Sequence, residues 1–120
     1  MPESRGQLAQ GSLVWADVAD GRGHIKRRPL VIVTETSEIV LDGPVVGVAV
    51  TTTYPEPPPR EFVELPWDRR RHPATRLVRR SAAVCNWLVE LTPSQVVEVR
   101  GYVPTKVLLQ IIERVRDLNG

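Results

Sequence analysis

The pattern of hydrophobic and polar residues predicts a mainly β protein that ends in one helix. Short runs rich in β-branched residues are separated by turns that contain glycine, proline or aspartate. The predicted strands cover residues 12–18, 30–33, 45–52, 62–65, 81–91 and 96–103. Residues 30–33 are apolar throughout, which is typical of a strand buried on both faces. Pro29 disfavours helical angles at the residue before it, so we expect Arg28 to lie extended at the entrance of this strand.

The end of the chain has the periodicity of an amphipathic helix. Thr105 follows Pro104 and can cap a helix from Lys106 to about Leu118. Apolar residues fall on one stripe of this helix, which predicts a packing face. The stripe consists of Leu108, Ile111, Ile112, Val115 and Leu118. Six short strands followed by one helix predict a small barrel or a strongly bent sheet.

Length and composition place the chain among ordinary globular proteins. The 120 residues, with 42% hydrophobic and 25% charged residues, predict one domain over 1–120 and exclude disordered and collagen-like classes. The single cysteine, Cys85, lies in an apolar run, which excludes an intramolecular disulfide and predicts a buried thiol. Residues 1–10 are polar and expected to be flexible, and no 18-residue apolar stretch occurs. We therefore expect a cytoplasmic protein with no membrane partner.

Charge is distributed less evenly than the net value of +2 suggests. Residues 22–28 carry four positive charges and residues 69–80 carry six, and neither segment contains an acidic residue. The two segments sum to +10, so the rest of the chain sums to −8. Such separation creates a local field that attracts an anionic partner. Two solvated loops that keep the protein soluble are the other interpretation.

The sequence lacks the common catalytic motifs. It has no glycine-rich phosphate-binding loop and no serine nucleophile elbow. The two histidines, His24 and His72, lie in separate loops without clustered carboxylates, so we predict no metal and no cofactor. What remains is arginine, histidine and threonine near strand ends and beside basic segments.

Several segments together resemble the MazF/PemK (Kid) family of toxins from type II toxin–antitoxin systems. The similar segments are GSLVWADV (11–18), GH (23–24), RPLVIV (28–33), VAVTT (48–52), SAAVCN (81–86) and GYVP (101–104). The most specific part is the Trp-Asp strand followed by Arg-Pro and an apolar strand. The resemblance extends from about Gly11 to Leu118, and so covers most of the chain.

The resemblance implies an SH3-like barrel of the CcdB/MazF type and a homodimer. It also implies a metal-independent endoribonuclease that cleaves single-stranded RNA and is neutralised by an acidic antitoxin. In such toxins the arginine before proline and the residue that ends the third strand are catalytic, which corresponds here to Arg28 and Thr51. A guanidinium stabilises the charge that builds on the phosphorane, and a hydroxyl can donate to a phosphate oxygen. The expected products carry a 2′,3′-cyclic phosphate and a 5′-OH.

The candidate general base is His24, which matches a loop histidine of the family, since histidine is the side chain best suited to proton transfer near neutral pH. In the Kid branch an Arg-Cys-Asp triplet supplies acid–base groups, whereas this chain has Val84, Cys85 and Asn86. Asparagine cannot act as a carboxylate base. The residues expected to bind RNA are Lys26, Arg27, Thr52, Arg69, Arg70, Arg71, Arg79 and Arg80.

Two functions stay open on the sequence. The first is the endoribonuclease toxin, favoured by Arg28 and Thr51. The second is a non-catalytic SH3-like module that binds nucleic acid or protein, with a gyrase-directed toxin like CcdB as a variant. The second is favoured by Asn86 and by a loop before Arg28 about two residues shorter than in the family. In either case the Arg-rich loop in 66–80 predicts a surface that follows an RNA backbone or docks an antitoxin.

Overall fold

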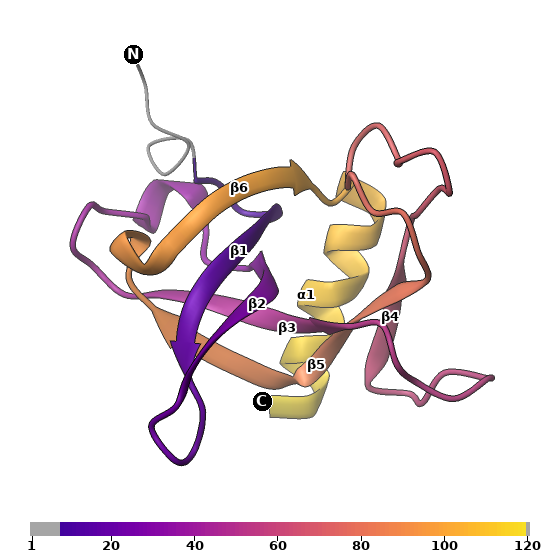
Figure 1. Ribbon diagram of the computed structural model, residues 1–120, viewed down its shortest axis with the longest axis horizontal. Helices are drawn as coiled ribbons and strands as arrows, with labels where there is room; N and C mark the ends of the chain where they lie inside the picture. Colours follow the sequence, from indigo (N-terminus) through magenta and orange to yellow (C-terminus); the bar gives the residue numbers. More distant parts are fainter. Residues whose placement is uncertain (1–7, 120) are drawn as a thin grey trace.

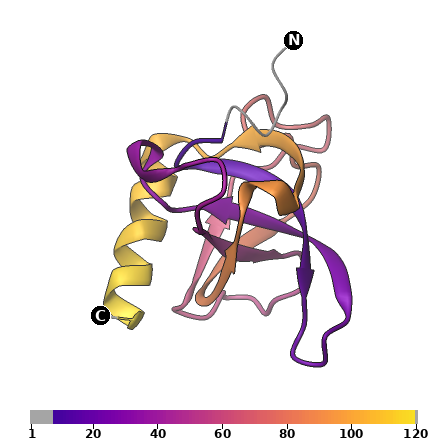
Figure 2. The same ribbon diagram turned by 90° about the vertical axis from the view of Figure 1, so that its left-hand side faces the viewer.

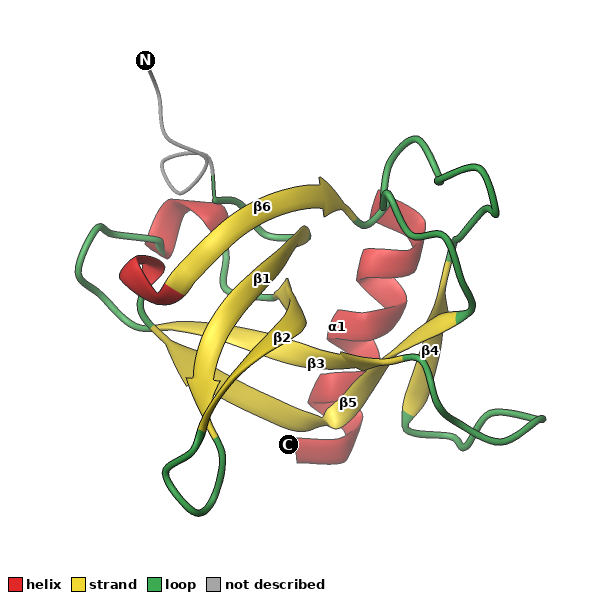
Figure 3. Cartoon of the chain, in the orientation of Figure 1, coloured by secondary structure: helices red, strands yellow, loops and turns green. Residues whose placement is uncertain are grey.

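The computed structural model describes residues 8–119, which form one antiparallel sheet, one α-helix and two short 3-10 helices, η2 (Thr36–Glu38) and η3 (Pro93–Gln95) (Figures 1 and 3). The elements are β1 (Ser12–Ala19), β2 (Ile25–Ile32), β3 (Val45–Thr51), β4 (Phe62–Leu65), β5 (Ser81–Leu91), β6 (Val96–Tyr102) and α1 (Thr105–Asn119). Within the sheet the strand order is β4-β5-β3-β2-β1-β6. The prediction of a mainly β fold with a C-terminal amphipathic helix is therefore confirmed.

The sheet curls into a partly open barrel whose two edges are β4 and β6. The loop of residues 66–80 connects β4 to β5 and docks on the edge strand β6 (Figure 1). The N–H of Tyr102 donates to the carbonyl of Ala74 over 3.0 Å. Gly101 permits this approach, since a Cβ at that position would lie 2.4 Å from the carbonyl oxygen of Ala74. The loop thereby spans the opening of the barrel.

Two cores lie on opposite faces of the sheet, as side-chain alternation along strands requires. The first core, packed against α1, contains Leu13, Val31, Val48, Val50, Val63, Leu65, Ala83, Cys85, Val103, Leu108 and Ile111. The second core contains Leu8, Val14, Ala16, Val18, Leu30, Ile32, Val45, Ala49, Leu91 and Val96. Figure 2 shows α1 along one side of the sheet. The prediction that 30–33 is buried on both faces is confirmed for residues 30–32, because consecutive residues of β2 enter different cores.

The second strand begins earlier than its apolar run indicates. β2 starts at Ile25 and pairs with β1 as far as Ala19, so the connection between the strands is only residues 20–24. Arg28 pairs with Ala16 and therefore lies inside the strand, not at its entrance. The prediction missed this extension because it followed hydrophobicity, whereas backbone pairing and the facing Asp17–Arg27 pair hold the charged half of the strand.

Both ends of the described chain also differ from the prediction. Leu8 is buried, and the N–H of Gln10 donates to the Thr36 hydroxyl over 3.0 Å, so residues 8–10 are packed against the sheet. Residues 1–7, the rest of the segment expected to be flexible, lie outside the described part of the chain. Helix α1 includes Thr105, and its first bond runs from the N–H of Leu108 to the carbonyl of Pro104. Among the described residues, no helix is both long and apolar enough to span a membrane.

Candidate nucleic-acid interface

Strands β2 and β3 separate next to the residues assigned to catalysis. Their pairing ends at Leu30 and Ala49, and the next residue of β2, Pro29, has no N–H to extend it. Leu30 and Ala49 both contact the second core. Because side chains alternate, Arg28 and Thr51 project from the same face as Leu30 and Ala49. Arg28 and Thr51 each lie two residues beyond the last pair, so the two candidate catalytic residues share one face of adjacent strands.

The Arg28 guanidinium is oriented by an aromatic ring. Its central carbon lies 4.9 Å from the ring centre of Trp87 on β5. Trp87 lies in a bulge, because residues 85–87 are inserted between the β5 residues that pair with Ala49 and Val48. Within residues 8–119 no carboxylate oxygen lies within 4 Å of Arg28. A cation–π contact positions the guanidinium and leaves its charge available to an anion.

Thr51 is held by the turn that ends β3. Its hydroxyl accepts a hydrogen bond from the N–H of Thr53 over 3.1 Å and donates to the carbonyl of the same residue over 3.2 Å. Such turns around threonine fix the hydroxyl without burying it. The proton can turn from the Thr53 carbonyl to a phosphate oxygen at the cost of one exposed hydrogen bond.

His24 lies at the exposed tip of the β1–β2 hairpin, with 71% of its side chain accessible. The carboxylate of Asp20 accepts the N–H groups of Arg22 and His24, over 2.8 and 2.9 Å, and these bonds lower the pKa of Asp20. Four residues of extended chain, about 13 Å, separate His24 from Arg28. The fold of the single chain does not bring the candidate base next to the candidate catalytic pair.

Lys26 and Arg27 are both exposed on β2. The Arg27 Nε lies 2.9 Å from Oδ1 of Asp17 on β1. This hydrogen bond lowers the pKa of Asp17 and raises that of Arg27. Of the three consecutive basic residues in β2, Arg27 is thus the one whose charge is compensated by a carboxylate.

The Arg-rich loop places its arginines in three different settings. Arg69, Arg70 and Arg71 are exposed around a turn in which the Asp68 carboxylate accepts the N–H of Arg70 over 2.8 Å. Arg79 is also exposed and lines a pocket described below. These four residues are accessible to an anionic partner.

Arg80 is engaged within the protein. Its guanidinium lies 3.8 Å from the ring centre of Tyr54, bonds the carboxylate of Glu56, and places Nε 3.4 Å from the Glu64 carboxylate. It also donates to the carbonyls of Tyr54 and Pro55, over 3.2 and 3.3 Å. The Tyr54 hydroxyl donates to Glu64 over 2.9 Å, and burial together with this bond raises the pKa of Tyr54 to about 12. These bonds fix residues 54–56, which follow β3, against Glu64 on β4 and against the residue that precedes β5.

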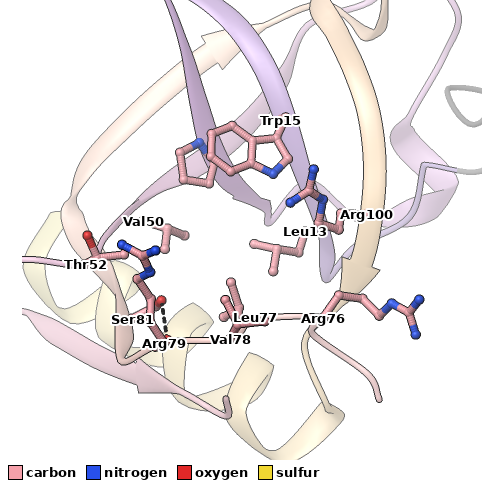
Figure 4. Close-up of a pocket in the computed structure, with 11 residues that line it drawn as sticks. Leu13, Trp15, Val50, Thr52, Arg76, Leu77, Val78, Arg79, Ser81 and Arg100 are labelled. Carbon is pink, nitrogen blue, oxygen red and sulfur yellow. Dashed lines mark hydrogen bonds between the residues drawn. The ribbon is translucent and has the colours of Figure 1, made fainter. Parts of the chain in front are cut away.

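A pocket of about 420 Å³ opens on the other face of the β2–β3 separation (Figure 4). It is lined by Leu13, Trp15, Pro29, Val50, Thr52, Arg76, Leu77, Val78, Arg79, Ser81 and Arg100. Figure 4 shows Trp15 on one side and Leu77 and Val78 on the opposite side, with Arg79 and Arg100 flanking the opening between them. Thr52 belongs to this pocket, whereas Thr51, its neighbour in the chain, belongs to the face of Arg28.

Comparison with solved structures identifies the architecture. MazE–MazF from Deinococcus radiodurans superposes with a TM-score of 0.70 at 19% identity, covering 92% of this chain and 94% of that one. The chain has the MazF fold. An endoribonuclease from a mycobacterial species gives 0.68 at 16% identity, covering 92% and 88%, and the Mycobacterium tuberculosis toxin MazF-mt6 gives 0.64 at 17%, covering 88% and 93%. No family model and no curated protein matches the sequence. At these identities the MazF fold is what is established, and function has to be argued from the site.

On this MazF fold, the stretch that resembles the Kid triplet contains no acid–base pair. Val84 and Cys85 are buried and Asn86 is exposed. Cys85 is buried, which confirms the predicted buried thiol, and this burial raises the pKa of the thiol to about 11. Among residues 8–119, no three histidine, cysteine, aspartate or glutamate side chains gather closely enough to hold a metal ion.

Sequence reasoning did not assign Trp87, Arg76 or Arg100 to this interface. Arg76 and Arg100 line the pocket, and Trp87 stacks on Arg28. Alternation along β1 and β6 does not predict the contact between Trp15 and Arg100, because the pairing of the two strands shifts register between Leu13 and Val14 and leaves Arg100 without a partner in β1. Trp87 could not have been found this way, because the bulge in β5 breaks the alternation that such reasoning uses.

Proposed function

We propose that the protein is the toxin of a type II toxin–antitoxin system and acts as an endoribonuclease on single-stranded RNA. The observation that carries the proposal is the shared face of Arg28 and Thr51 at the separation of β2 and β3. Arg28 is positioned by Trp87 and retains an uncompensated charge in the described chain. The MazF fold, which extends over 92% of the chain, supports the same assignment.

In the proposed reaction the 2′-oxygen of a ribose attacks the adjacent phosphorus and the bond from phosphorus to the 5′-oxygen breaks. A base takes the 2′-OH proton, and an acid returns a proton to the leaving 5′-oxygen. Arg28 stabilises the dianionic phosphorane, and the Thr51 hydroxyl donates to a non-bridging oxygen. The products are a 2′,3′-cyclic phosphate and a 5′-OH. Since the nucleophile belongs to the substrate, the mechanism requires no metal-bound water.

His24 remains the proposed general base. For it to reach the 2′-OH, the exposed β1–β2 hairpin would have to fold over the bound RNA, because about 13 Å of strand separates it from Arg28. A second candidate function, a binding module without catalysis, is favoured by this separation and by Asn86 in place of a carboxylate. The two functions differ in whether RNA is cut.

The test is incubation of the purified protein with a long single-stranded RNA in the presence of EDTA. We expect discrete fragments whose 5′ ends accept a phosphate from polynucleotide kinase without prior dephosphorylation. Arg28→Ala should abolish the fragments, whereas Arg116→Gln, a change on the outside of α1, should retain them. Intact RNA with the unmodified protein at micromolar concentration would contradict the enzyme and leave the binding module.

The proposal includes two protein partners, an acidic antitoxin and a second copy of the chain. An acidic partner is complementary to the exposed arginines of the 66–80 loop. Light scattering coupled to size-exclusion chromatography should give twice the 13.4 kDa mass of one chain. A monomer at all concentrations would contradict the homodimer.

A further inference from the structure

The pocket of Figure 4 combines an apolar interior with a positively charged rim. Leu13, Val50 and Leu77 contribute aliphatic surface, and Trp15 is half-buried with its ring accessible from the pocket side. Its volume of about 420 Å³ lies within the range of pockets that enclose small organic ligands. An aromatic wall next to aliphatic surface suits a planar ring system.

Three arginines give the rim its charge. Arg76 and Arg79 have no carboxylate within 4 Å in the described chain. Arg100 is paired with Glu98 over 3.0 Å, and its guanidinium carbon lies 5.4 Å from the ring centre of Trp15. Arg79 and Arg100 flank the opening from two sides (Figure 4). The chemistry that fits is a planar ring that stacks through its faces and is joined to a negative group, which describes a nucleotide.

The pocket and the candidate catalytic pair occupy the same part of β2 and β3. Pro29 and Thr52 line the pocket, and they directly follow Arg28 and Thr51 in the chain. Consecutive Cα atoms are 3.8 Å apart, so the two sites are separated by about the thickness of the sheet. The β2–β3 ladder has already ended at this point. Two sites this close can contact neighbouring nucleotides of one RNA strand.

We propose that the pocket binds one nucleotide adjacent to the scissile phosphate, and that it selects the sequence at which the RNA is cut. The base stacks on Trp15, the exposed Thr52 hydroxyl bonds its edge, and Arg79 binds its phosphate. This assignment rests on the proposed ribonuclease function for its role in cleavage. Its binding component can be measured independently of cleavage.

The experiment uses a labelled single-stranded RNA with 2′-O-methyl groups throughout, which cannot be cleaved by 2′-OH attack. Fluorescence anisotropy measures its affinity for the unmodified protein, for Trp15→Leu and for Arg79→Gln. We expect each change to weaken binding about tenfold, since a stacked base or a phosphate contact is lost. Arg116→Gln on α1 is the matched control and should bind like the unmodified protein. Circular dichroism and thermal unfolding verify that each variant is folded.

A second measurement follows the cut sites on a long unmodified RNA. Thr52→Val and Arg79→Gln should change the preferred sequence while cleavage continues, whereas Arg28→Ala should end cleavage at every site. If the protein cuts no RNA, the ribonuclease proposal fails. The anisotropy measurements still test whether the pocket binds a nucleotide. Unchanged affinity in folded Trp15→Leu and Arg79→Gln would overturn the pocket assignment. An acidic peptide whose binding these two changes abolish, with RNA binding intact, would overturn it in favour of a protein ligand.

Discussion

The two basic segments, residues 22–28 and 69–80, look alike in sequence but are held in different ways. The first contributes to β2, where Arg27 is paired with Asp17 and Arg28 stacks on Trp87. The second is a loop whose arginines are exposed, line the pocket or, in the case of Arg80, bond the protein itself. In a strand, side-chain alternation determines the face of the sheet from which each arginine projects. In a loop, the direction of each arginine depends on the residues that contact it. The role of an arginine therefore follows from the neighbours that compensate its charge, and not from the density of charge along the chain.

The largest expected difference is within the first segment, between Arg28 and Arg27. Arg28→Ala should lower kcat by about 100- to 1,000-fold, the usual loss when a donor to the transition-state charge is removed. Arg28→Lys should recover little, because an ammonium cannot reproduce the planar guanidinium on Trp87. Arg27→Ala should change kcat less than about fivefold, since its charge is already compensated by Asp17. Single-turnover cleavage of a short labelled RNA measures the rate of all three variants. Equal losses of rate in Arg27→Ala and Arg28→Ala would contradict the different roles assigned to these two arginines.

Arg80 should behave as a structural residue in spite of its position in a basic run. Arg80→Met removes its bonds to Glu64 and to the carbonyls of Tyr54 and Pro55, which should cost about 1–3 kcal/mol of unfolding free energy. Arg70→Gln, in the exposed part of the same loop, should change stability by less than about 0.5 kcal/mol. Urea unfolding followed by tryptophan fluorescence compares the two. A stable Arg80→Met variant with weakened RNA binding would reverse the assignment.

Arg69, Arg70 and Arg71 should act as backbone contacts with no preference for sequence. Replacing all three by glutamine should reduce the slope of log K against log salt concentration by about 2, at roughly 0.7 per single-strand phosphate contact. The loss of affinity caused by the triple change should be the same for RNAs of different sequence, whereas the effect of Thr52→Val should depend on the sequence. Anisotropy titrations between low and physiological salt provide the slope. An unchanged slope would show that the loop lies outside the RNA path.

The smallest effect concerns Asp17, whose pKa is lowered by its bond to Arg27. A carboxyl with a lowered folded-state pKa adds stability above its unfolded pKa of about 4, and this contribution is lost as the pH falls through the folded value. Asp17→Asn has no such contribution, so the difference in melting temperature between the two proteins should be present at pH 6 and shrink below about pH 4. Thermal scans from pH 6 to 2.5 measure it. A difference that is independent of pH would mean that the pair is not formed in solution.

Most of the fold was predictable because local signals and packing agree. Turns at 20–21 and 42–44 bound apolar strands, and the stripe from Leu108 to Leu118 does pack on the first core. The start of β2 was not predictable, since residues 25–28 are charged or exposed and pair only because β1 lies beside them. Strand pairing of this kind depends on tertiary context, which local hydrophobicity does not contain.

The candidate site was predictable to a lesser degree. Arg28 and Thr51 could be chosen from the resemblance, and the structure then places them on one face. The position of Trp87 depends on a bulge of β5, and the pocket depends on how the 66–80 loop folds back, with Arg71 and Arg76 at positive φ of 82° and 65°. Such conformations are rare for arginine and carry no clear sequence signal. His24 was chosen as the general base for the chemistry of its imidazole. The sequence does not contain the distance between the hairpin tip, where His24 lies, and Arg28.

The position of the loop that forms one wall of the pocket depends on Gly101, which has no side chain. The loop wall that contains Arg76 and Arg79 rests on β6 at a point where even a methyl group would meet the carbonyls of Ala74 and Thr75, at 2.4 and 2.8 Å. A side chain at this position would force the loop or β6 to shift, without changing any residue that lines the pocket. The shape of the pocket therefore depends on a glycine that is not among the residues that line it.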